Sequence, residues 1–138
     1  MGAAGFLTFP VLAALSAGLL VVHVLIQANF SSLDRGLAWN AGSRDKPKDV
    51  KSVVAARADR MSANFRETYP GFVALVLALA VAGDPSGWGH AGALVWFAGR
   101  IVYIPLYLAG VAYIRSLAWG VALVGLVMML VGVLATAS

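Results

Sequence analysis

The chain has 138 residues, of which 61% are apolar and only 12% are charged. A soluble domain typically has roughly 25% charged residues and, at this size, leaves much of its surface in water, so a water-soluble globular protein is nearly excluded. The high hydrophobicity also excludes disorder, and the lack of cysteine excludes a disulfide framework, a thiolate zinc site and a cysteine nucleophile. The composition predicts one all-α integral membrane domain, a four-transmembrane-helix bundle.

Four stretches are expected to cross the bilayer as helices. They cover about residues 4–28, 58–83, 88–113 and 116–136. No basic residue precedes the first stretch, so we expect a retained span rather than a cleaved signal peptide. Residues 29–50 are polar and are predicted to form a loop. The connection between the third and fourth spans should be very short, with Ser116 as the N-cap of the last helix.

The basic residues predict the orientation of the spans. The net charge is +4, and most of the ten Lys and Arg residues lie between Arg35 and Arg66. The connection between the second and third spans carries Asp84 and no Lys or Arg. The positive-inside rule therefore places both termini outside and the other two connections in the cytoplasm. Because this distribution is a topology signal rather than a free basic patch, no nucleic-acid partner is expected.

Polar residues recur along the second span at helical spacing. Arg57, Arg60, Asn64 and Glu67 follow one another at i, i+3, i+7 and i+10, which places them on one face of a helix. The apolar run 70–83 is too short to cross the bilayer alone, so these side chains are expected at interfacial depth or deeper. The alternative is an interfacial turn whose ions pair with each other, for example Arg60 with Glu67.

The third span carries a second polar stripe. Arg100, Tyr103 and Tyr107 are spaced i, i+3 and i+7. A charge inside a span costs at least ~2.5–3.5 kcal/mol, so Arg100 must face protein or a water-filled cavity, and its nearest plausible partner is Glu67. The tyrosines could instead belong to an aromatic belt at the interface. Arg115 likewise could be a headgroup anchor.

Together these residues predict a cationic cleft near the cytoplasmic face. Arginine forks suit carboxylates, and a single glutamate suits an amine, so the complementary ligand is a small zwitterion with more than one carboxylate. A thiol on that ligand would be pushed toward the thiolate. The sequence shows no metal-ligand cluster and no glycine-rich phosphate loop, and His23 and His90 are expected to be packing or interface residues.

Three segments resemble one known superfamily. RADRMSANFRETYP resembles the second-helix signature of the MAPEG superfamily, the membrane-associated proteins in eicosanoid and glutathione metabolism. GRIVYIPLYLAGVAYIRSLAW resembles its third-to-fourth helix segment, and GLAWNAGSRDKP resembles its bacterial branch. The resemblance covers about residues 5–135. It implies similarity to microsomal glutathione transferases, a homotrimer in a bacterial inner membrane, and glutathione sites between subunits near the cytoplasmic side.

The resemblance also implies roles for individual residues. The implied glutathione contacts are Arg57, Arg60, Asn64, Glu67, Arg100, Tyr103 and Tyr107. Arg115 and Ser116 match the pair beside the thiol, where the arginine would stabilise the thiolate with help from Ser116 or Tyr107. The chain departs from many members at Ala63 and near Gln27, where those members carry basic residues.

The resemblance therefore implies a glutathione-dependent membrane transferase or peroxidase. Glutathione would be a co-substrate, and a lipophilic electrophile or hydroperoxide would arrive from the bilayer along an apolar groove between subunits. The alternative is a non-catalytic lipid-binding or scaffold protein of the same fold. A four-span multidrug exporter is disfavoured, because such exporters use a membrane-embedded acidic residue that the first span here lacks.

Overall fold

The computed structural model describes residues 5–138 and consists of helices joined by short connections. The helices are α1 (Phe9–Arg35), α2 (Leu37–Ala41), α3 (Val53–Ala82), α4 (Trp88–Leu108) and α5 (Ile114–Thr136). All except α2 are long and apolar enough to cross a membrane. The prediction of an all-α fold with four membrane-spanning helices is therefore confirmed. The expected start of the first span, near residue 4, lies outside the described residues.

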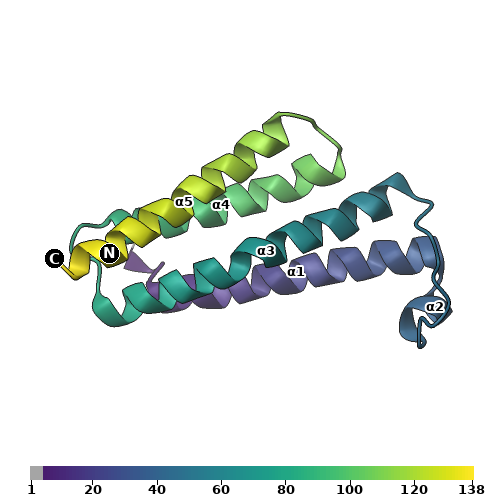
Figure 1. The fold of residues 1–138 in the computed structure, drawn as a ribbon, viewed down its shortest axis with the longest axis horizontal. Helices are drawn as coiled ribbons and strands as arrows, with labels where there is room; N and C mark the ends of the chain where they lie inside the picture. The colour runs from purple at the N-terminus through teal and green to yellow at the C-terminus, as the bar shows by residue number, and fades with distance from the viewer. Residues whose placement is uncertain (1–4) are drawn as a thin grey trace.

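The long helices form two antiparallel pairs, α1 with α3 and α4 with α5 (Figure 1). Both chain ends lie at one end of the bundle, and α2 and the α4–α5 turn lie at the other (Figure 1). Aromatic stacking joins the pairs: the rings of Phe72 on α3 and Trp96 on α4 lie 3.8 Å apart. Leu12 of α1 belongs to the same buried cluster, so the core is continuous between the pairs.

Glycines let α4 and α5 pack backbone against backbone. A Cβ at Gly92 would lie 2.5 Å from the Gly125 carbonyl oxygen, and one at Gly125 would lie 2.6 Å from that of Gly92. Gly132 lies equally close to the backbone of Gly89, nearer the chain termini. Small residues favour such close approach in lipid, where association depends on packing rather than on apolar burial.

The predicted loop over residues 29–50 is wrong in its first part. Helix α1 continues to Arg35 and α2 follows after Gly36. Polar side chains support this extension, because Asn29 donates to the Leu25 carbonyl and Arg35 donates to Ser31, each one turn back. Gly36 ends the helix with a φ of 96°, which a residue with a side chain rarely adopts. The polar composition thus marked the end of the apolar run, not the end of the helix.

The predicted connection between the last two spans is also wrong in its bounds. Helix α4 ends at Leu108 rather than near residue 113, because Gly110 turns the chain with a φ of 72°. Helix α5 begins at Ile114, with Tyr113 at the N-cap position and no side-chain cap. Ser116 is therefore not the N-cap and lies inside the first turn of α5.

Candidate functional site

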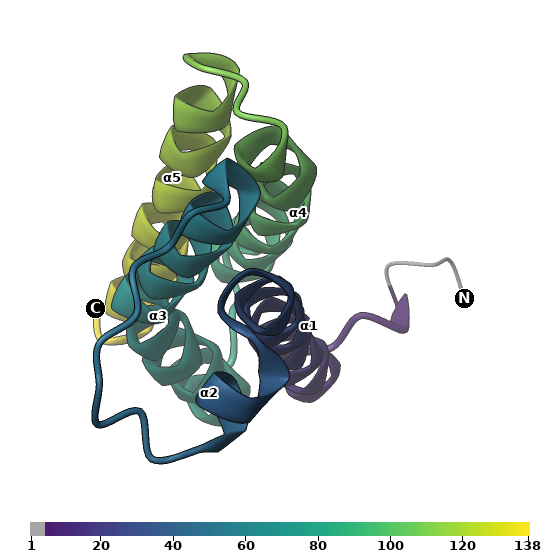
Figure 2. The ribbon, with the colours of Figure 1, turned by 90° about the vertical axis from the view of Figure 1, so that its right-hand side faces the viewer.

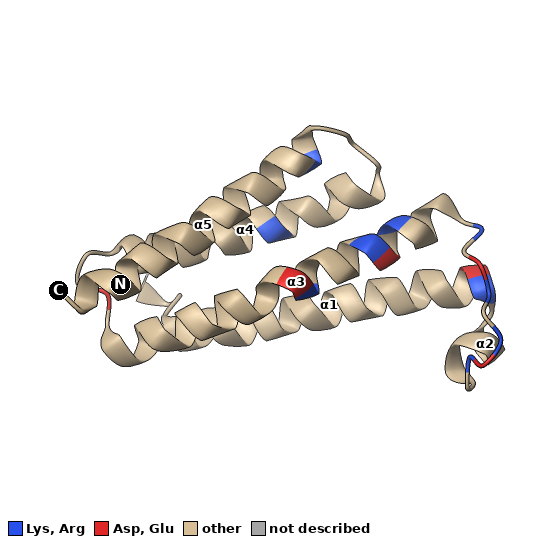
Figure 3. Ribbon diagram, viewed as in Figure 1, with Lys and Arg blue, Asp and Glu red and all other residues tan. Residues whose placement is uncertain are grey.

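Basic residues gather at the end of the bundle opposite the chain termini. Figure 3 shows them on α3, on α4 and at the start of α5, on both helix pairs. The residues of both polar stripes lie in this half, and α4 and α5 each contribute one charged side chain, Arg100 and Arg115. Residues far apart in the sequence are thus brought to one end of the bundle.

Tyr107 on α4 is the centre of one group of contacts. Its hydroxyl accepts a hydrogen bond from Arg60 Nε on α3, at 3.3 Å. The Arg115 guanidinium of α5 lies over its ring, 4.8 Å from the centroid, in a cation–π contact. One buried phenol thereby joins two arginines from different helices.

Arg100 is the centre of the second group. It is only 1% exposed, and its Nη1 donates to Asn64 Oδ1 at 2.9 Å. Its guanidinium lies 4.6 Å from the ring centre of Tyr103, and that ring lies 5.2 Å from the ring of Tyr107. The two tyrosines therefore connect the Arg100 group to the Arg60–Tyr107–Arg115 group. We call these six residues, including Asn64 and Tyr103, the arginine–tyrosine cluster.

The expected pairing of Arg100 with Glu67 is wrong. Asn64 lies one turn earlier on α3, faces α4 and takes that position, whereas Glu67 is exposed on the outer side of α3. Within residues 5–138, Nε and Nη2 of Arg100 have no hydrogen-bond partner. A buried charge with two unsatisfied donors is costly, so these donors are suited to an anion or to water.

Arg57 has a contact of a different kind. Its Nη1 donates to the Leu108 carbonyl, at 3.2 Å, at the C-terminus of α4. Such terminal carbonyls have no partner within the helix, and a cation there also complements the helix dipole. The guanidinium lies against Gly110 in the space that a Cβ would occupy. Arg57 therefore fastens the α4–α5 turn to α3.

Two predicted site residues lie outside these contacts. Glu67 and Ser116 are both exposed, and neither contributes a hydrogen bond within the described part of the chain. The alternative in which Arg60 pairs with Glu67 is not observed either. Among residues 5–138 the ion pair is Arg35–Asp59, with 3.1 Å between Nη2 and Oδ2.

That ion pair belongs to a polar group that the sequence analysis missed. Asp59 on α3 accepts from Arg35 and, through its other oxygen, from Gln27 Nε2 at 2.9 Å, both on α1. Arg35 also donates to Ser31. Asp59 does not share the helix face of the α3 stripe, and this position in the sequence could have indicated that it faces a different helix. The group holds α1 to α3 near the arginine–tyrosine cluster.

The isolated histidines are packing residues, as predicted. His23 is buried, its ring stacks on Phe65 at 4.1 Å, and its Nδ1 contacts the Leu19 carbonyl oxygen. His90 contacts the Leu7 carbonyl oxygen through Nε2.

A protein-family model described as the MAPEG family matches residues 9–135. The chain belongs to the MAPEG family. The match spans all four long helices, so this is an integral membrane protein of a family related to glutathione and eicosanoids, many of whose members are glutathione-dependent enzymes. Neither the curated proteins nor the solved structures that were searched gave a match.

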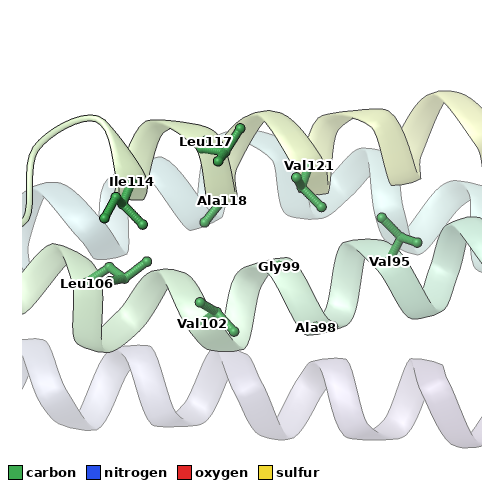
Figure 4. Close-up of a pocket in the computed structure, with 9 residues that line it drawn as sticks. All are labelled: Val95, Ala98, Gly99, Val102, Leu106, Ile114, Leu117, Ala118 and Val121. Carbon is green, nitrogen blue, oxygen red and sulfur yellow. The ribbon is translucent and has the colours of Figure 1, made fainter.

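An apolar groove lies beside the cluster in this MAPEG chain. It has a volume of about 410 Å³ and runs between α4 and α5 (Figure 4). Its lining residues are Val95, Ala98, Gly99, Val102, Leu106, Ile114, Leu117, Ala118 and Val121. Leu106 and Ile114 directly precede Tyr107 and Arg115 in the chain, so the groove and the cluster lie on neighbouring faces of the same ends of α4 and α5. The MAPEG fold here places a cationic group next to a surface suited to a lipophilic molecule.

Proposed function

We propose that this MAPEG protein is a glutathione-dependent membrane transferase or peroxidase acting on lipophilic electrophiles or hydroperoxides. The observation that carries the proposal is the arrangement of Arg60, Arg100 and Arg115, which approach one tyrosine pair from α3, α4 and α5. Three guanidinium groups in one half of a membrane bundle favour a ligand with several anionic groups. Glutathione has two carboxylates and an ionisable thiol.

Different members of the cluster would contact different parts of glutathione. Arg60 is exposed, so its guanidinium would bind a carboxylate of glutathione. Asn64 and Arg100 are more deeply buried and would form the inner wall of the binding site. Glu67 would receive the amine of the γ-glutamyl group. Tyr103 and Tyr107 would separate the binding arginines from Arg115. Arg57 would support the site through the α4–α5 turn rather than touch the substrate.

The chemical role belongs to Arg115. Its guanidinium would stabilise the thiolate, the form in which sulfur is a nucleophile, while Tyr107 holds it by cation–π contact. In conjugation the thiol gives its proton to water, and the thiolate then forms a bond to the electrophilic carbon while the bond from that carbon to its leaving group breaks and the leaving group departs with the electron pair. Ser116 is exposed close by in sequence and would assist only if α5 turns or a neighbouring subunit covers it.

The α4–α5 groove supports a lipophilic second substrate. Its lining is aliphatic or glycine throughout, and it opens on the outside of helices that cross the membrane. A molecule dissolved in the bilayer could enter it sideways and approach the cluster from Leu106 and Ile114. The groove here lies within one chain, whereas the sequence analysis expected one between subunits.

The exposed face of α3 supports a homotrimer. Along it, exposed residues recur in alternating steps of three and four, the spacing of a helix–helix seam. The residues of this α3 seam are Arg60, Ala63, Glu67, Pro70, Ala74, Leu77 and Val81. Charged side chains on a lipid-facing surface are costly. Packing three α3 helices around one axis would cover the seam and bring Arg60 toward Glu67 of a neighbouring chain.

The expected orientation completes the proposal. Both termini would lie outside a bacterial inner membrane, and the cluster, at the opposite end of the bundle, would lie near the cytoplasm (Figure 1). The basic residues of the α1–α3 connection, together with Arg115 in the first turn of α5, support this orientation. Glutathione would then enter from the cytoplasm.

The test compares binding with thiolate formation in purified, solubilised protein. Calorimetry should show glutathione binding that is lost in Arg60→Ala/Glu67→Ala. The ultraviolet absorbance of the thiolate should rise on binding to the wild type. Arg115→Ala should still bind glutathione, give no thiolate signal and lose about 10²-fold in kcat, the effect of removing one group that stabilises a developing anion. Equal turnover in Arg115→Ala and wild type would remove Arg115 from the mechanism.

A second candidate is a non-catalytic lipid-binding protein. The wholly apolar groove between α4 and α5 favours it, since such a surface also suits an acyl chain. This candidate expects lipid to co-purify with the protein and expects no thermal stabilisation by glutathione. A clear glutathione-dependent rise in the melting temperature would count against it.

A further inference from the structure

The connection between α1 and α3 folds into a small hollow beside the bundle. It has a volume of about 340 Å³ and is lined by Ala38, Trp39, Gly42, Ser43, Arg44, Asp45 and Lys46. Helix α2 lies at the end of the bundle opposite the chain termini, on the side away from α4 and α5 (Figures 1 and 2). The hollow is therefore separate from the arginine–tyrosine cluster and from the α4–α5 groove.

Exposed aliphatic residues lie on α1 and α2 just before this hollow in the chain. Leu25 on α1 is exposed, Leu33 near its end is 82% exposed, and Leu37 on α2 is 70% exposed. Large apolar side chains with such exposure are costly in water but are matched by acyl chains. The hollow thus lies at the depth where acyl chains give way to headgroups.

Basic side chains surround the indole of Trp39 in this hollow. The guanidinium groups of Arg35 and Arg44 lie 5.3 and 5.6 Å from its ring centre, and its N–H donates to the Lys46 carbonyl at 2.8 Å. Arg44 uses Nε and Nη2 to bond Asn40. Within residues 5–138, its Nη1 and the Lys46 amine make no hydrogen bond, so both can bind an anion. Tryptophan is itself typical of the membrane interface.

We propose that this hollow binds the phosphate of an anionic phospholipid from the adjacent leaflet. Arg44 Nη1 and the Lys46 amine contact the phosphate, Ser43 donates to its oxygens, and the acyl chains lie against Leu33 and Leu37. The leaflet on the basic side of a membrane protein is the one that carries anionic lipid, so the charges are complementary. Asp45 also lines the hollow and limits the affinity by repulsion. The inference is independent of glutathione binding.

The experiment measures lipid retention by native mass spectrometry. The full chain is exchanged into micelles with equal amounts of phosphatidylglycerol and phosphatidylcholine of identical acyl chains. The wild type should retain phosphatidylglycerol preferentially. Arg44→Gln/Lys46→Gln should lower that preference by about fivefold for each basic side chain removed. Asp45→Asn should raise the preference, an effect that misfolding cannot produce.

Lys51→Gln is the matched control. Lys51 is exposed on the same connection but does not line the hollow, and its contact with Asp34 is made by the backbone N–H. It should keep the wild-type preference. Equal retention of both lipids by the wild type would overturn the proposal. An equal loss of the phosphatidylglycerol preference in Lys51→Gln would also overturn it, because the preference would then come from diffuse charge. Loss of the preference in excess inorganic phosphate would overturn it as well, because the ligand would then be a soluble anion.

Discussion

Arg100 shows how one polar contact can decide whether a charge is tolerated in a membrane bundle. It is almost fully buried, and its Nη1 donates a hydrogen bond to Asn64. The aromatic faces of Tyr103 and Phe65 also contact the guanidinium, at 4.6 and 5.2 Å. A hydrogen bond to Asn64 and contacts with two aromatic rings thus take the place of the Glu67 carboxylate that the helical spacing had suggested.

Asn64 is therefore expected to be a stability determinant as well as a binding residue. Asn64→Leu removes the one acceptor of a buried guanidinium and should cost about 1.5–3 kcal/mol, which is measurable as a lower melting temperature in detergent without glutathione. Asn64→Asp keeps an oxygen at the same place and adds an opposite charge, so it should retain most of the stability. If both variants melt alike, Arg100 does not depend on this acceptor.

Tyr107 makes two separable contacts, one through its hydroxyl and one through its ring. Tyr107→Phe removes only the acceptor of Arg60 and should weaken glutathione binding about fivefold, the effect of roughly 1 kcal/mol. Tyr107→Leu also removes the ring beneath Arg115 and should lower turnover further. Calorimetry and turnover together distinguish the two contacts. Tyr113→Phe, at an exposed tyrosine, is the control, and identical behaviour of the Phe and Leu variants at position 107 would exclude a role for the ring.

At the scale of the elements, the α4–α5 turn depends on a side chain from a third helix. Arg57 bonds the end of α4 and fills the space beside Gly110. Gly110 is needed twice, for its left-handed backbone and for its missing side chain. The turn that places Tyr107 and Arg115 is thus partly built by α3.

Gly110→Ala should destabilise this turn and lower the melting temperature and turnover together. Its Cβ would displace Arg57, and its backbone would be strained. The matched control is Gly120→Ala, because Gly120 is helical with no neighbouring atom in reach of a Cβ, and alanine there should be neutral or slightly stabilising. In a double-mutant cycle, Arg57→Ala and Gly110→Ala should be strongly non-additive. Additive losses would show that the two residues act independently.

Much of this arrangement was predictable from the sequence, because apolar runs indicate membrane-spanning helices and helical spacing indicates which residues share one face of a helix. The two stripes face each other only in part: Arg60, Asn64, Arg100, Tyr103 and Tyr107 form one contact network, whereas Glu67 of the same α3 stripe is exposed and faces away from α4. Spacing does not give the rotation of one helix against another, so it could not choose between Asn64 and Glu67 for Arg100. Nor could it place the Arg57 contact, which depends on where α4 ends.

At the scale of the whole molecule, the α3 seam is the surface on which the proposed trimer depends. Its two charged residues, Arg60 and Glu67, lie toward the cluster, and the seam residues beyond them toward the chain termini are apolar, all exposed. The candidate site opens on this face through Arg60 and Glu67. Assembly and substrate binding would therefore share the same surface.

Two tryptophan substitutions test this assembly. Leu77 on the seam is 53% exposed, and Leu25 on α1 is 55% exposed, so they form a matched pair. Leu77→Trp should separate closely packed α3 helices and lower the trimer fraction in native mass spectrometry, because bulk is not tolerated where helices approach in lipid. Leu25→Trp should leave the trimer intact. A monomeric wild type would contradict the trimer, and equal loss in both variants would contradict the seam.

The glycine contacts between α4 and α5 have a mechanical consequence. Near the chain termini the two helix backbones pack directly against each other at four glycines, Gly89, Gly92, Gly125 and Gly132. Helices α4 and α5 therefore form one rigid pair. At the opposite end of the bundle, hydrogen bonds from the Arg57 and Arg60 side chains of α3 hold this helix pair. Nearer the chain termini the pair meets α3 through the stacked rings of Phe72 and Trp96, so it should pivot as a lever about that contact and move Tyr107 and Arg115 as one unit away from Asn64. Opening and closing around a substrate would then be a small rotation of half the bundle rather than the motion of a loop.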